Sequence, residues 1–477
     1  MLLTVDIGTS SFKSALWDTD GERLSFAAVP LSIKYNGLGY EANPVEWLRA
    51  FEECRKKLLN DKIKNLSLVR AIVISGNGPT LVPVTEPPVF GRSAVSPAAR
   101  LWLDNRLTET AEKCQAEVCA LLGGHVDASF FLPKVLTIKN EEEELYRKTK
   151  FFLGCPEYLA YALTGSARSV FPSEGFDRWF WNDAVLEKLS LDKEKFPPFI
   201  GPGDLFGILT AQAADYFGFE KNIPVICGGP DFFAAILGAG ITEPGQACDR
   251  TGSSDGINLC TEKRVTDERL MSYGHPVKPF WNLSGIIKTT GKAVDWCRDL
   301  LGISGFEDFL ALAGKSKSGS GGLVFLPYLA GDRASAGNKC ALGQWRGISL
   351  GAGRPEFANS VLEGIGFAIR GVIAAMEMAG RENSLNTEIK ELRVTGGLAG
   401  IGYLNRLKAD ITGRKIIVPV QKEAELLGLA IIGACYLGAF SSWAEASRAL
   451  VRIGETYEPD LEKTEFYKNI KINDRDN

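Results

Sequence analysis

Hydrophobic and polar residues recur with two different periods along this chain. Short apolar or alternating runs predict β-strands over residues 2–6, 12–17 and 23–29, and the turns between them are rich in glycine and small polar residues. Because these turns are short, we expect the strands to pair as an antiparallel meander. A further apolar run predicts a strand over 69–74, which leads into the glycine-containing loop 75–79.

Longer segments have the spacing of helices. Asn43 and Pro44 are the residue types of an N-cap and a first helical position, and they predict a helix that runs to about Leu59. The other helices that we predict from their apolar spacing lie near 106–122, 134–147, 357–378 and 428–434.

The second half of the chain begins a similar pattern. A glycine- and hydroxyl-rich loop at 249–256 precedes a predicted strand at 257–260, and its likeness to the loop after Asp6 predicts an internal duplication. A chain of 477 residues is too long for one core. We therefore expect domains at 1–243 and 244–455, followed by a charged tail at 456–477 that need not join the core.

Composition narrows the class of protein. With 45% hydrophobic and 23% charged residues, the chain is typical of soluble globular proteins. Its net charge of −4 argues against nucleic acid as the main partner, and no apolar run reaches the roughly 20 residues of a membrane span. We expect no signal peptide, and the ten scattered cysteines are typical of reduced thiols in the cytoplasm.

The chain contains two histidines, His125 and His275. Histidine-based triads and histidine-rich metal sites are therefore nearly excluded. We expect a carboxylate to carry out any proton transfer.

One candidate carboxylate is Asp231, which follows Gly228, Gly229 and Pro230 and precedes a long run of small and apolar residues. The run has the composition of a buried helix, and an acid in the first turn is favoured by the helix dipole. Asp231 is then a simple helix cap. Alternatively, the paired glycines give small ligands access to the backbone, and Asp231 is a general base in an apolar pocket.

Two short loops are candidates for binding phosphate, namely Gly8-Thr9-Ser10 and Gly252-Ser253-Ser254. Backbone N–H groups and hydroxyls in such loops can point at phosphate oxygens, although glycine and serine also make ordinary turns. The sequence lacks the P-loop motif, and Gly201 to Gly207 misses the dinucleotide-binding spacing. Asp6, beside the first loop, could hold magnesium or make a local turn hydrogen bond.

Several short motifs follow one another in a fixed order. They are DIGTS at 6–10, LWLDNR at 101–106, LTG at 163–165, GGPD at 228–231, YLAGDR at 328–333, GQWRGI at 343–348 followed by EFANSVLE at 356–363, GGLA at 396–399 and EAELLG at 423–428. Together they resemble the FGGY family of carbohydrate kinases over roughly residues 1–450.

This resemblance implies an α/β fold of two ribonuclease H-like (actin-like ATPase) domains, with ATP and a sugar in the cleft between them. It implies that Asp231 is the general base and that Asp6 helps to place Mg²⁺. The residues that it places near the nucleotide are Gly8, Thr9, Ser10, Gly252, Ser253, Ser254, Gly291, Gly396, Gly397, Ala399 and Asn405. Those that it places near the sugar are Asn77, Gly78, Trp102, Asp104, Asp231 and Phe232.

Some positions depart from the family pattern. Pentulose kinases often carry Gln-Met-His where this chain has Asn77-Gly78-Pro79, and Thr137 stands where a tryptophan is expected. The acidic residue that commonly follows the LTG motif is not evident. Phe232 replaces the polar or small residue of many relatives, which leads us to expect a less polar sugar site, one that favours a deoxy sugar or a smaller polyol.

The resulting prediction is an ATP-dependent kinase acting on a ketopentose such as xylulose, or on a related sugar or polyol. One alternative is a nucleotide-gated sugar-binding protein of the same fold with weak or no kinase activity. Another is an actin- or chaperone-like ATPase, which would lack the sugar-side motifs. We expect a cytoplasmic protein with small-molecule partners and no nucleic acid or membrane partner. The sequence leaves open whether the protein forms a homodimer.

Overall fold

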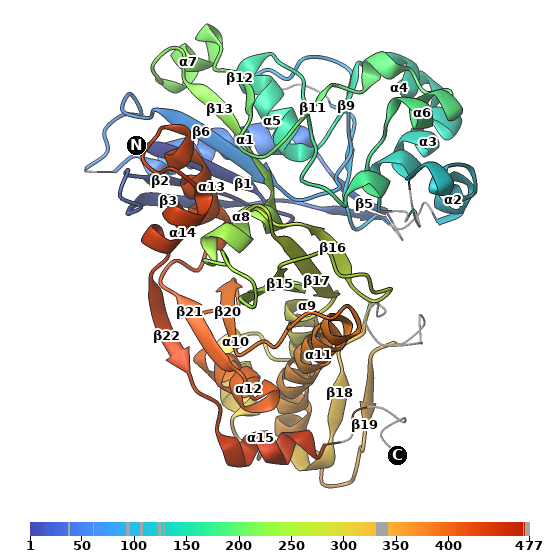
Figure 1. Ribbon diagram of the computed structural model, residues 1–477, viewed down its shortest axis with the longest axis vertical. Helices are drawn as coiled ribbons and strands as arrows, with labels where there is room; N and C mark the ends of the chain where they lie inside the picture. Colours follow the sequence, from blue (N-terminus) through green and yellow to red (C-terminus); the bar gives the residue numbers. More distant parts are fainter. Residues whose placement is uncertain are drawn as a thin grey trace. The chain divides into compact units, whose positions relative to one another are not determined.

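The structure is a computed structural model that describes residues 1–36, 39–60, 62–91, 96–104, 108–122, 126, 129–330, 342–470 and 472. The chain forms two compact units (Figure 1). Unit 1 comprises Met1–Gly238 and Glu425–Leu450, and unit 2 comprises Ala239–Ala424 and Val451–Asn477. Each unit has its own central sheet and its own hydrophobic core.

The sheet of unit 1 has the strand order β12-β13-β6-β1-β2-β3. Strands β1, β2 and β3 form the expected antiparallel meander, whereas β1, β6 and β13 run parallel. The strands are β1 (Leu2–Ile7), β2 (Ser11–Trp17), β3 (Arg23–Pro30), β6 (Ala71–Gly76), β12 (Leu205–Ile208) and β13 (Pro224–Pro230). Every residue of β1 and β6 is buried, as expected for central strands that are covered on both faces.

The sheet of unit 2 repeats this connectivity, in the order β16-β17-β15-β14-β20-β21-β22. Its strands are β14 (Ala247–Thr251), β15 (Asp255–Thr261), β16 (Met271–Gly274), β17 (Trp281–Ile287), β20 (Glu391–Gly396), β21 (Lys415–Pro419) and β22 (Ile453–Tyr457). An antiparallel β14-β15-β17 meander is followed by β20 and β21, which run parallel to β14. The predicted duplication is thus confirmed, and both units have the ribonuclease H-like topology.

Helices cover both faces of the unit 1 sheet. The helices of this unit are α1 (Pro44–Leu58), α2 (Thr108–Leu122), α3 (Phe131–Glu141), α4 (Glu143–Lys148), α5 (Cys155–Thr164), α6 (Asp183–Lys188), α7 (Ala211–Phe217), α8 (Asp231–Gly238), α13 (Ala424–Tyr436) and α14 (Trp443–Leu450). Helix α1 begins as predicted, since the Asn43 side chain accepts a hydrogen bond from the Val45 N–H. The single helix expected at 134–147 is broken at Glu142 into α3 and α4.

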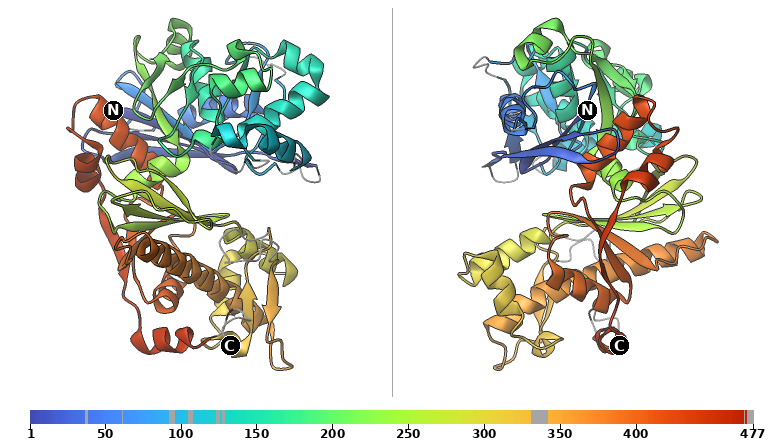
Figure 2. Two further views of the ribbon diagram at one scale, coloured as in Figure 1. Left: turned by 45° about the vertical axis from the view of Figure 1, so that its right-hand side comes forward. Right: turned by 90° about the vertical axis from the view of Figure 1, so that its left-hand side faces the viewer.

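The domain boundary differs from the expected one. We assigned residues 244–455 to the second domain, but α13 and α14 pack with unit 1, beside its N-terminal strands (Figure 2). The reason is a close approach of helix to sheet, because a Cβ at Gly433 would lie only 2.9 Å from Val73 and 3.0 Å from Leu2. The small residues of α13 therefore allow it to pack closely on the unit 1 sheet. The order of residues along the chain does not reveal this contact.

The helices of unit 2 are α9 (Gly291–Leu300), α10 (Phe306–Ala313), α11 (Arg354–Glu382), α12 (Gly402–Thr412) and α15 (Leu461–Lys468). The long α11 includes the helix predicted at 357–378 and supplies much of the core of this unit. Smaller strands complete both units, namely β4 (Lys34–Asn36), β5 (Gly39–Ala42), β7 (Val82–Val84), β8 (Ala99–Arg100), β9 (Phe151–Leu153), β10 (Ser169–Val170), β11 (Phe199–Ile200), β18 (Val324–Leu326) and β19 (Gln344–Arg346).

The helix in the charged tail, α15, joins the core, although the sequence did not require it to do so. Tyr467 of α15 is fully buried, and its hydroxyl donates to Oε1 of Glu363 at 2.8 Å. Ser320 is also buried and donates to the other Glu363 oxygen at 2.7 Å. The buried residues of α15 are Thr464 and Tyr467, so its charged face dominates the sequence and conceals the contact.

Candidate functional site

Three parallel strands of unit 1 end at the same edge of the sheet. Asp6 lies near the end of β1, Ser75 near the end of β6, and Pro230 ends β13, with Asp231 as the next residue. Ligands of open α/β sheets bind outside the carboxyl ends of such strands. The edge therefore brings together two of the acids that the sequence singled out.

Asp6 is buried and hydrogen-bonded. Its Oδ1 accepts from the Ser75 hydroxyl at 2.8 Å, and its side chain is 4% exposed. Burial, followed by the negative charges of Glu425 and Asp231, raises the pKa of Asp6 to about 7, against the opposing effects of Lys13 and Ser75. Two carboxyl groups thus act on the buried Asp6, a situation that a cation would relieve.

Glu425 has no role in the sequence-based prediction. It lies in the first turn of α13, which packs against the unit 1 sheet. The motif at 423–428 was recognised as a family feature, but motif order alone gives no partner for its acids. The fold supplies the partner, because Glu425 contributes to the pKa of Asp6, far away in sequence.

The two glycines before Asp231 have packing roles. A Cβ at Gly228 would overlap the side chain of Leu429 on α13, and Gly229 has φ +76°, a conformation that favours glycine. The expectation that both glycines open the backbone to a ligand is therefore wrong for Gly228, whose space Leu429 takes.

Asp231 is partly exposed at the start of α8. Its Oδ1 accepts from the backbone N–H of Phe232 at 2.6 Å. This contact agrees with the helix-cap interpretation. It uses one oxygen of the carboxylate and is also compatible with a general base.

The first hydroxyl loop makes the tight turn between β1 and β2. The N–H of Gly8 donates to the Ser11 carbonyl at 3.0 Å, while Ser10 is exposed. The indole N–H of Trp102 donates to the Thr9 hydroxyl at 3.0 Å. A residue assigned to the sugar side and one assigned to the phosphate side are therefore in contact within unit 1.

Asn77 and Asp104 are both directed into the protein. The Asn77 amide donates to the Ile7 carbonyl at 2.9 Å, and its oxygen accepts from the Thr80 hydroxyl at 2.6 Å. Asp104 is fully buried, and its Oδ2 accepts from the Tyr40 N–H at 3.4 Å. These contacts hold the loops around the site, and Asn77 with Gly78 also lines the pocket described next.

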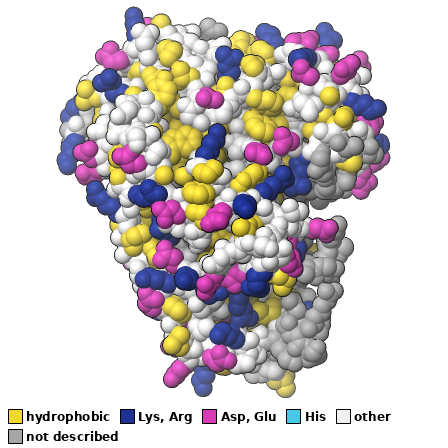
Figure 3. All heavy atoms as spheres, in the orientation of Figure 1, with side chains coloured by type: hydrophobic (Ala, Val, Ile, Leu, Met, Phe, Trp, Pro, Cys, Tyr) yellow, Lys and Arg dark blue, Asp and Glu magenta, His cyan; other side chains and the backbone are white. Residues whose placement is uncertain are grey.

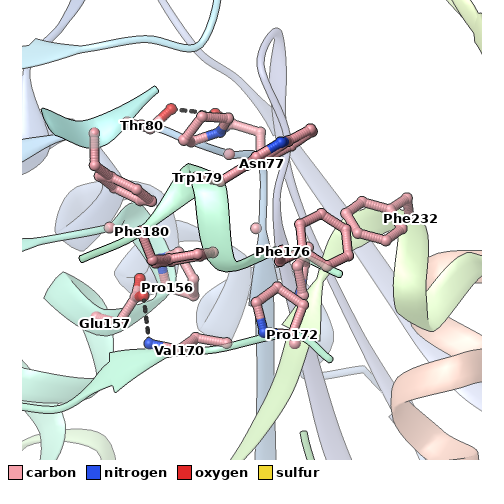
Figure 4. A pocket seen from close by; sticks show the side chains of 17 residues that line it. Asn77, Thr80, Pro156, Glu157, Val170, Pro172, Phe176, Trp179, Phe180 and Phe232 are labelled. Atoms are coloured by element: carbon pink, nitrogen blue, oxygen red, sulfur yellow. Dashed lines mark hydrogen bonds between the residues drawn. The ribbon is translucent and has the colours of Figure 1, made fainter. Parts of the chain in front are cut away.

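A pocket with a cavity volume of about 50 Å³ lies beside Asp231 in unit 1, and Figure 4 shows it closely. Prolines and aromatic rings form most of its wall. Its lining residues are Gly76, Asn77, Gly78, Pro79, Thr80, Phe131, Gly154, Pro156, Glu157, Val170, Pro172, Phe176, Trp179, Phe180, Gly229, Pro230 and Phe232. The wall therefore includes the residues on either side of Asp231.

The fully buried Lys134 fixes one wall of this pocket. Its ammonium group donates to the Pro79 carbonyl at 2.6 Å and to the Ser129 carbonyl at 2.8 Å. No pattern in the sequence gave Lys134 a role. Its structural role is to tie α3 to the loop that carries Asn77 and Gly78.

The second hydroxyl loop, in unit 2, is closed by Asp255. Its Oδ1 accepts from the hydroxyls of Thr251 at 2.9 Å and Thr290 at 2.6 Å. The N–H of Gly291 donates to the Gly252 carbonyl at 2.9 Å, and a Cβ at 291 would overlap that carbonyl. Gly252, Ser253, Ser254 and Gly291 therefore lie together, with Ser253 exposed.

The other residues assigned to the nucleotide adjoin this loop. Gly396 pairs with Thr251 across the parallel strands β14 and β20 and has φ +93°. The N–H of Ala399 donates to the Gly396 carbonyl at 3.1 Å, and the buried Asn405 donates to the Ala399 carbonyl at 2.8 Å. Gly397 stands between them, so unit 2 brings its assigned residues into one region.

Beneath the loop lies an ion pair that the sequence did not reveal. Nζ of Lys408 lies 2.5 Å from Asp249 and 3.5 Å from Asp255, and all three side chains are fully buried. Burial, followed by the charge of Asp255, raises the pKa of Asp249 to about 7. Burial lowers the pKa of Lys408, but the two carboxylates outweigh it and raise that pKa overall.

Two of the family motifs lie partly outside the described residues. Asn105 and Arg106, and Gly331 to Arg333 of the YLAGDR motif, lie outside the described residues.

Within the described ranges, no three acidic, cysteine or histidine side chains are close enough to hold a metal directly, and no helix has the length and hydropathy of a membrane span. On the face in Figure 3, basic and acidic side chains are interspersed, as the small net charge predicts.

Family models match most of the chain. The N-terminal domain model of the FGGY family of carbohydrate kinases matches residues 1–238, and the C-terminal domain model matches 250–437. The chain belongs to the FGGY family of carbohydrate kinases. It is therefore an ATP-dependent carbohydrate kinase, and the alternatives of a sugar-binding protein and an actin-like ATPase are not supported.

Individual FGGY proteins are similar over nearly the whole length. A xylulose kinase from Staphylococcus epidermidis is 27% identical, over 98% of this chain and 94% of that protein. Structures of a ligand-bound xylulose kinase and of a gluconate kinase, both from Lactobacillus acidophilus, each match with a TM-score of 0.82 at 20% identity. The xylulose kinase match covers 98% of this chain and 96% of that one, and the gluconate kinase match covers 98% and 95%. At this identity the structures support the fold, and they differ in substrate.

Proposed function

We propose that this kinase phosphorylates a ketopentose such as xylulose, or a related sugar or polyol, with Asp231 as the general base. The observation that carries this proposal is the position of Asp231, which acts on the buried Asp6 together with Glu425 and whose two chain neighbours, Pro230 and Phe232, line the pocket. A hydroxyl held at the mouth of that pocket would meet a carboxylate able to accept its proton. The similarity to a xylulose kinase supports the choice of a ketopentose.

The remaining groups provide positioning and charge. Phosphoryl transfer needs little covalent chemistry from the protein, so alignment and charge stabilisation provide most of the rate. We assign the loops at Gly8–Ser10 and Gly252–Ser254 to the ATP phosphates. Gly396, Gly397, Ala399 and Asn405 are assigned to the adenosine, and Gly291 to the nucleotide.

A hydrated Mg²⁺ fits the acidic cluster. Asp6 and Glu425 provide the oxygen ligands that magnesium prefers, and the pKa of Asp6 is raised by burial first and by the charges of Glu425 and Asp231 second. Because the carboxylates are not close enough to surround a bare ion, they would hold a magnesium ion that keeps several waters. When bound, the ion would neutralise charge on the phosphates.

The cysteines support a cytoplasmic location. All nine cysteines in the described part of the chain are free thiols, and seven of them are buried. Such thiols are typical of a reducing compartment.

The test is phosphate transfer from ATP to a panel of ketopentoses, ketohexoses, deoxy sugars and polyols. We expect Asp231→Asn to lower kcat by about 10²–10⁴-fold, since this is the usual contribution of a general base. The matched control is Asp183→Asn, which changes the exposed first residue of α6, a residue that does not line the pocket. Equal activity of the two variants, with unchanged melting temperatures, would exclude Asp231 as the base.

A further inference from the structure

Two buried acids and one buried base lie together beneath the second hydroxyl loop. Asp249 and Asp255 come from the paired strands β14 and β15, and Lys408 comes from α12. All three side chains are fully buried. If both acids were ionised, one negative charge would have no counter-charge, and such a charge is costly in a protein interior. One of the two acids should therefore keep its proton more firmly than an ordinary carboxyl group does.

The hydrogen bonds indicate which acid that is. Oδ1 of Asp255 accepts from the hydroxyls of Thr251 at 2.9 Å and Thr290 at 2.6 Å. Oδ2 of Asp249 accepts from Nζ of Lys408 at 2.5 Å, but Oδ1 of Asp249 is buried and has no donor among the described residues. Donors stabilise the ionised form of a carboxyl group. Asp255 is therefore the better carboxylate, and Oδ1 of Asp249 is the better place for the proton.

The surroundings of Asp249 agree with this assignment. Burial, followed by the charge of Asp255, raises the pKa of Asp249 to about 7, although Lys408 opposes the shift. The residues that pair with Asp249 on the neighbouring strands are apolar, namely Ile257 on β15 and Val394 on β20. In the described part of the chain, the charged groups that act on Asp249 are thus Asp255 and Lys408. Two carboxyl groups that share one site in this way titrate as a pair.

Asp255 connects this pair to the loop. Besides its bonds to the two threonines, its Oδ1 accepts from the N–H of Gly252 at 3.3 Å. The Thr290 hydroxyl also lies 3.2 Å from the Gly252 carbonyl oxygen. Resting on the proposed assignment of Gly252–Ser254 to the ATP phosphates, we propose that Asp249 is a positioning residue for the nucleotide. The loop binds ATP best while Asp249 carries its proton.

Loss of this proton weakens the support of the loop. A second negative charge beside Asp255 repels that carboxylate and adds to the negative charge beneath a loop that binds an anion. Because the pKa of Asp249 in the folded protein lies above the ordinary value of 3.8, its contribution to stability is complete below 3.8 and is lost as pH rises to about 7. The affinity for ATP should fall as pH rises through about 7, where the folded protein loses the proton.

The test is the Kd for ATP between pH 6 and pH 8.5, measured by calorimetric titration of the wild type and of Asp249→Asn without sugar. In the wild type, we expect the Kd to rise about fivefold or more over this range, as is typical of coupled sites. Asparagine has the shape of the protonated acid and offers a donor and an acceptor. Asp249→Asn should therefore match the wild type at pH 6 and keep that affinity at pH 8.5. The ratio of the two Kd values removes the titration of ATP and of Asp6, which both proteins share.

Two further variants separate this role from a merely structural one. Asp299→Asn, at an exposed residue of α9 in the same unit, should keep the pH profile of the wild type. Asp249→Leu, which has no hydrogen-bonding side chain, should bind ATP about fivefold or more weakly than Asp249→Asn at both ends of the range. Parallel pH profiles for the wild type and Asp249→Asn, or weak binding of ATP by Asp249→Asn at pH 6, would overturn the proposal.

A measurement on the wild type keeps the test decisive if a variant folds poorly. If ATP binds better to the protonated form, the bound protein holds the proton to a higher pH, so binding near pH 8 takes up protons from the buffer. Titrations with ATP and a chelator, in two buffers that differ in ionisation enthalpy, measure this uptake. Absence of uptake in the wild type would overturn the proposal, and so would equal uptake in Asp249→Asn.

The two proposals fail in different ways. Transfer to a sugar that is lost in Asp231→Asn, with parallel ATP profiles for the wild type and Asp249→Asn, overturns only the proposal for Asp249. Absence of transfer to every sugar and polyol overturns the proposed function itself.

Discussion

The ammonium group of Lys408 lies 2.5 Å from the Asp249 carboxylate, with both side chains fully buried in unit 2. Asp255 shares this cation and also accepts hydrogen bonds from Thr251 and Thr290. One buried lysine on α12 thus supports the loop that we assign to the ATP phosphates. A change at this lysine should affect both stability and nucleotide binding.

We expect Lys408→Met to lower the free energy of unfolding by about 3–5 kcal/mol, because it leaves two carboxylates buried without a counter-charge. The KM for ATP should rise as the loop loses its support, while the KM for the sugar should change little. Denaturant unfolding and steady-state kinetics measure the two effects. The control is Lys415→Met, which removes the exposed pair with Glu458 and should leave the unfolding midpoint almost unchanged. Similar midpoints for the two variants would contradict this role.

Gly291 should be intolerant of any side chain. A Cβ there would overlap the Gly252 carbonyl, which is backbone and cannot move aside cheaply. We expect Gly291→Ala to destabilise the protein by about 1–3 kcal/mol, as overpacking does, and to raise the KM for ATP. The control is Gly371→Ala, at an exposed helical position with open space, which should stabilise by about 0.5–1 kcal/mol. A normal KM for ATP in Gly291→Ala would count against the assignment of this loop to the nucleotide.

Magnesium should reverse a destabilisation that depends on Asp6. Burial and its acidic neighbours raise the pKa of Asp6 to about 7, so its contribution to stability is present below the unfolded-state value of 3.8 and is lost as pH rises through about 7. In chelator, Asp6→Asn should therefore be more stable than wild type at pH 8.5, with the difference shrinking toward pH 5.5.

Adding MgCl₂ at 100 times its Kd should stabilise the wild type by about 2.7 kcal/mol and Asp6→Asn much less. Scanning calorimetry measures both effects, with exposed Asp20→Asn as the control that should follow the wild type. An equal response to magnesium in all three proteins would remove Asp6 from the metal site.

His275 should give the protein a measurable loss of stability in mild acid. Burial lowers the pKa of His275 to about 4. Its Nδ1 accepts a hydrogen bond from the Val277 N–H at 3.0 Å, a contact that the neutral ring makes. As pH falls from about 6.5 to 4, the unfolded chain takes up a proton before the folded one does, so folding weakens by about 3 kcal/mol from this group. Unfolding curves for wild type and His275→Asn should differ in their pH slope over that interval. Parallel slopes would show that His275 is not buried in its neutral form.

The apolar runs predicted individual strands and helices, and the ordered motifs predicted the class of fold through the resemblance to the FGGY family. Strands such as Leu2–Ile7 and the hydroxyl loops at 8–10 and 252–254 are local patterns, and local patterns can be read without coordinates. The motifs around Asp6, Asp231 and Gly396 likewise identified the family. They did so because the chemistry of each motif is contained within a few consecutive residues.

Only the tertiary structure determined the contacts between segments that are far apart in the sequence. Glu425 adds its charge to Asp6, and Leu429 takes the space beside Gly228, because α13 returns to the first sheet. Lys408 meets Asp249, and Tyr467 meets Glu363, across comparable separations. No periodicity records such pairs, since a side chain's partner depends on how elements stack and not on its neighbours along the chain. The aromatic wall around Phe232 likewise depends on how separate segments pack.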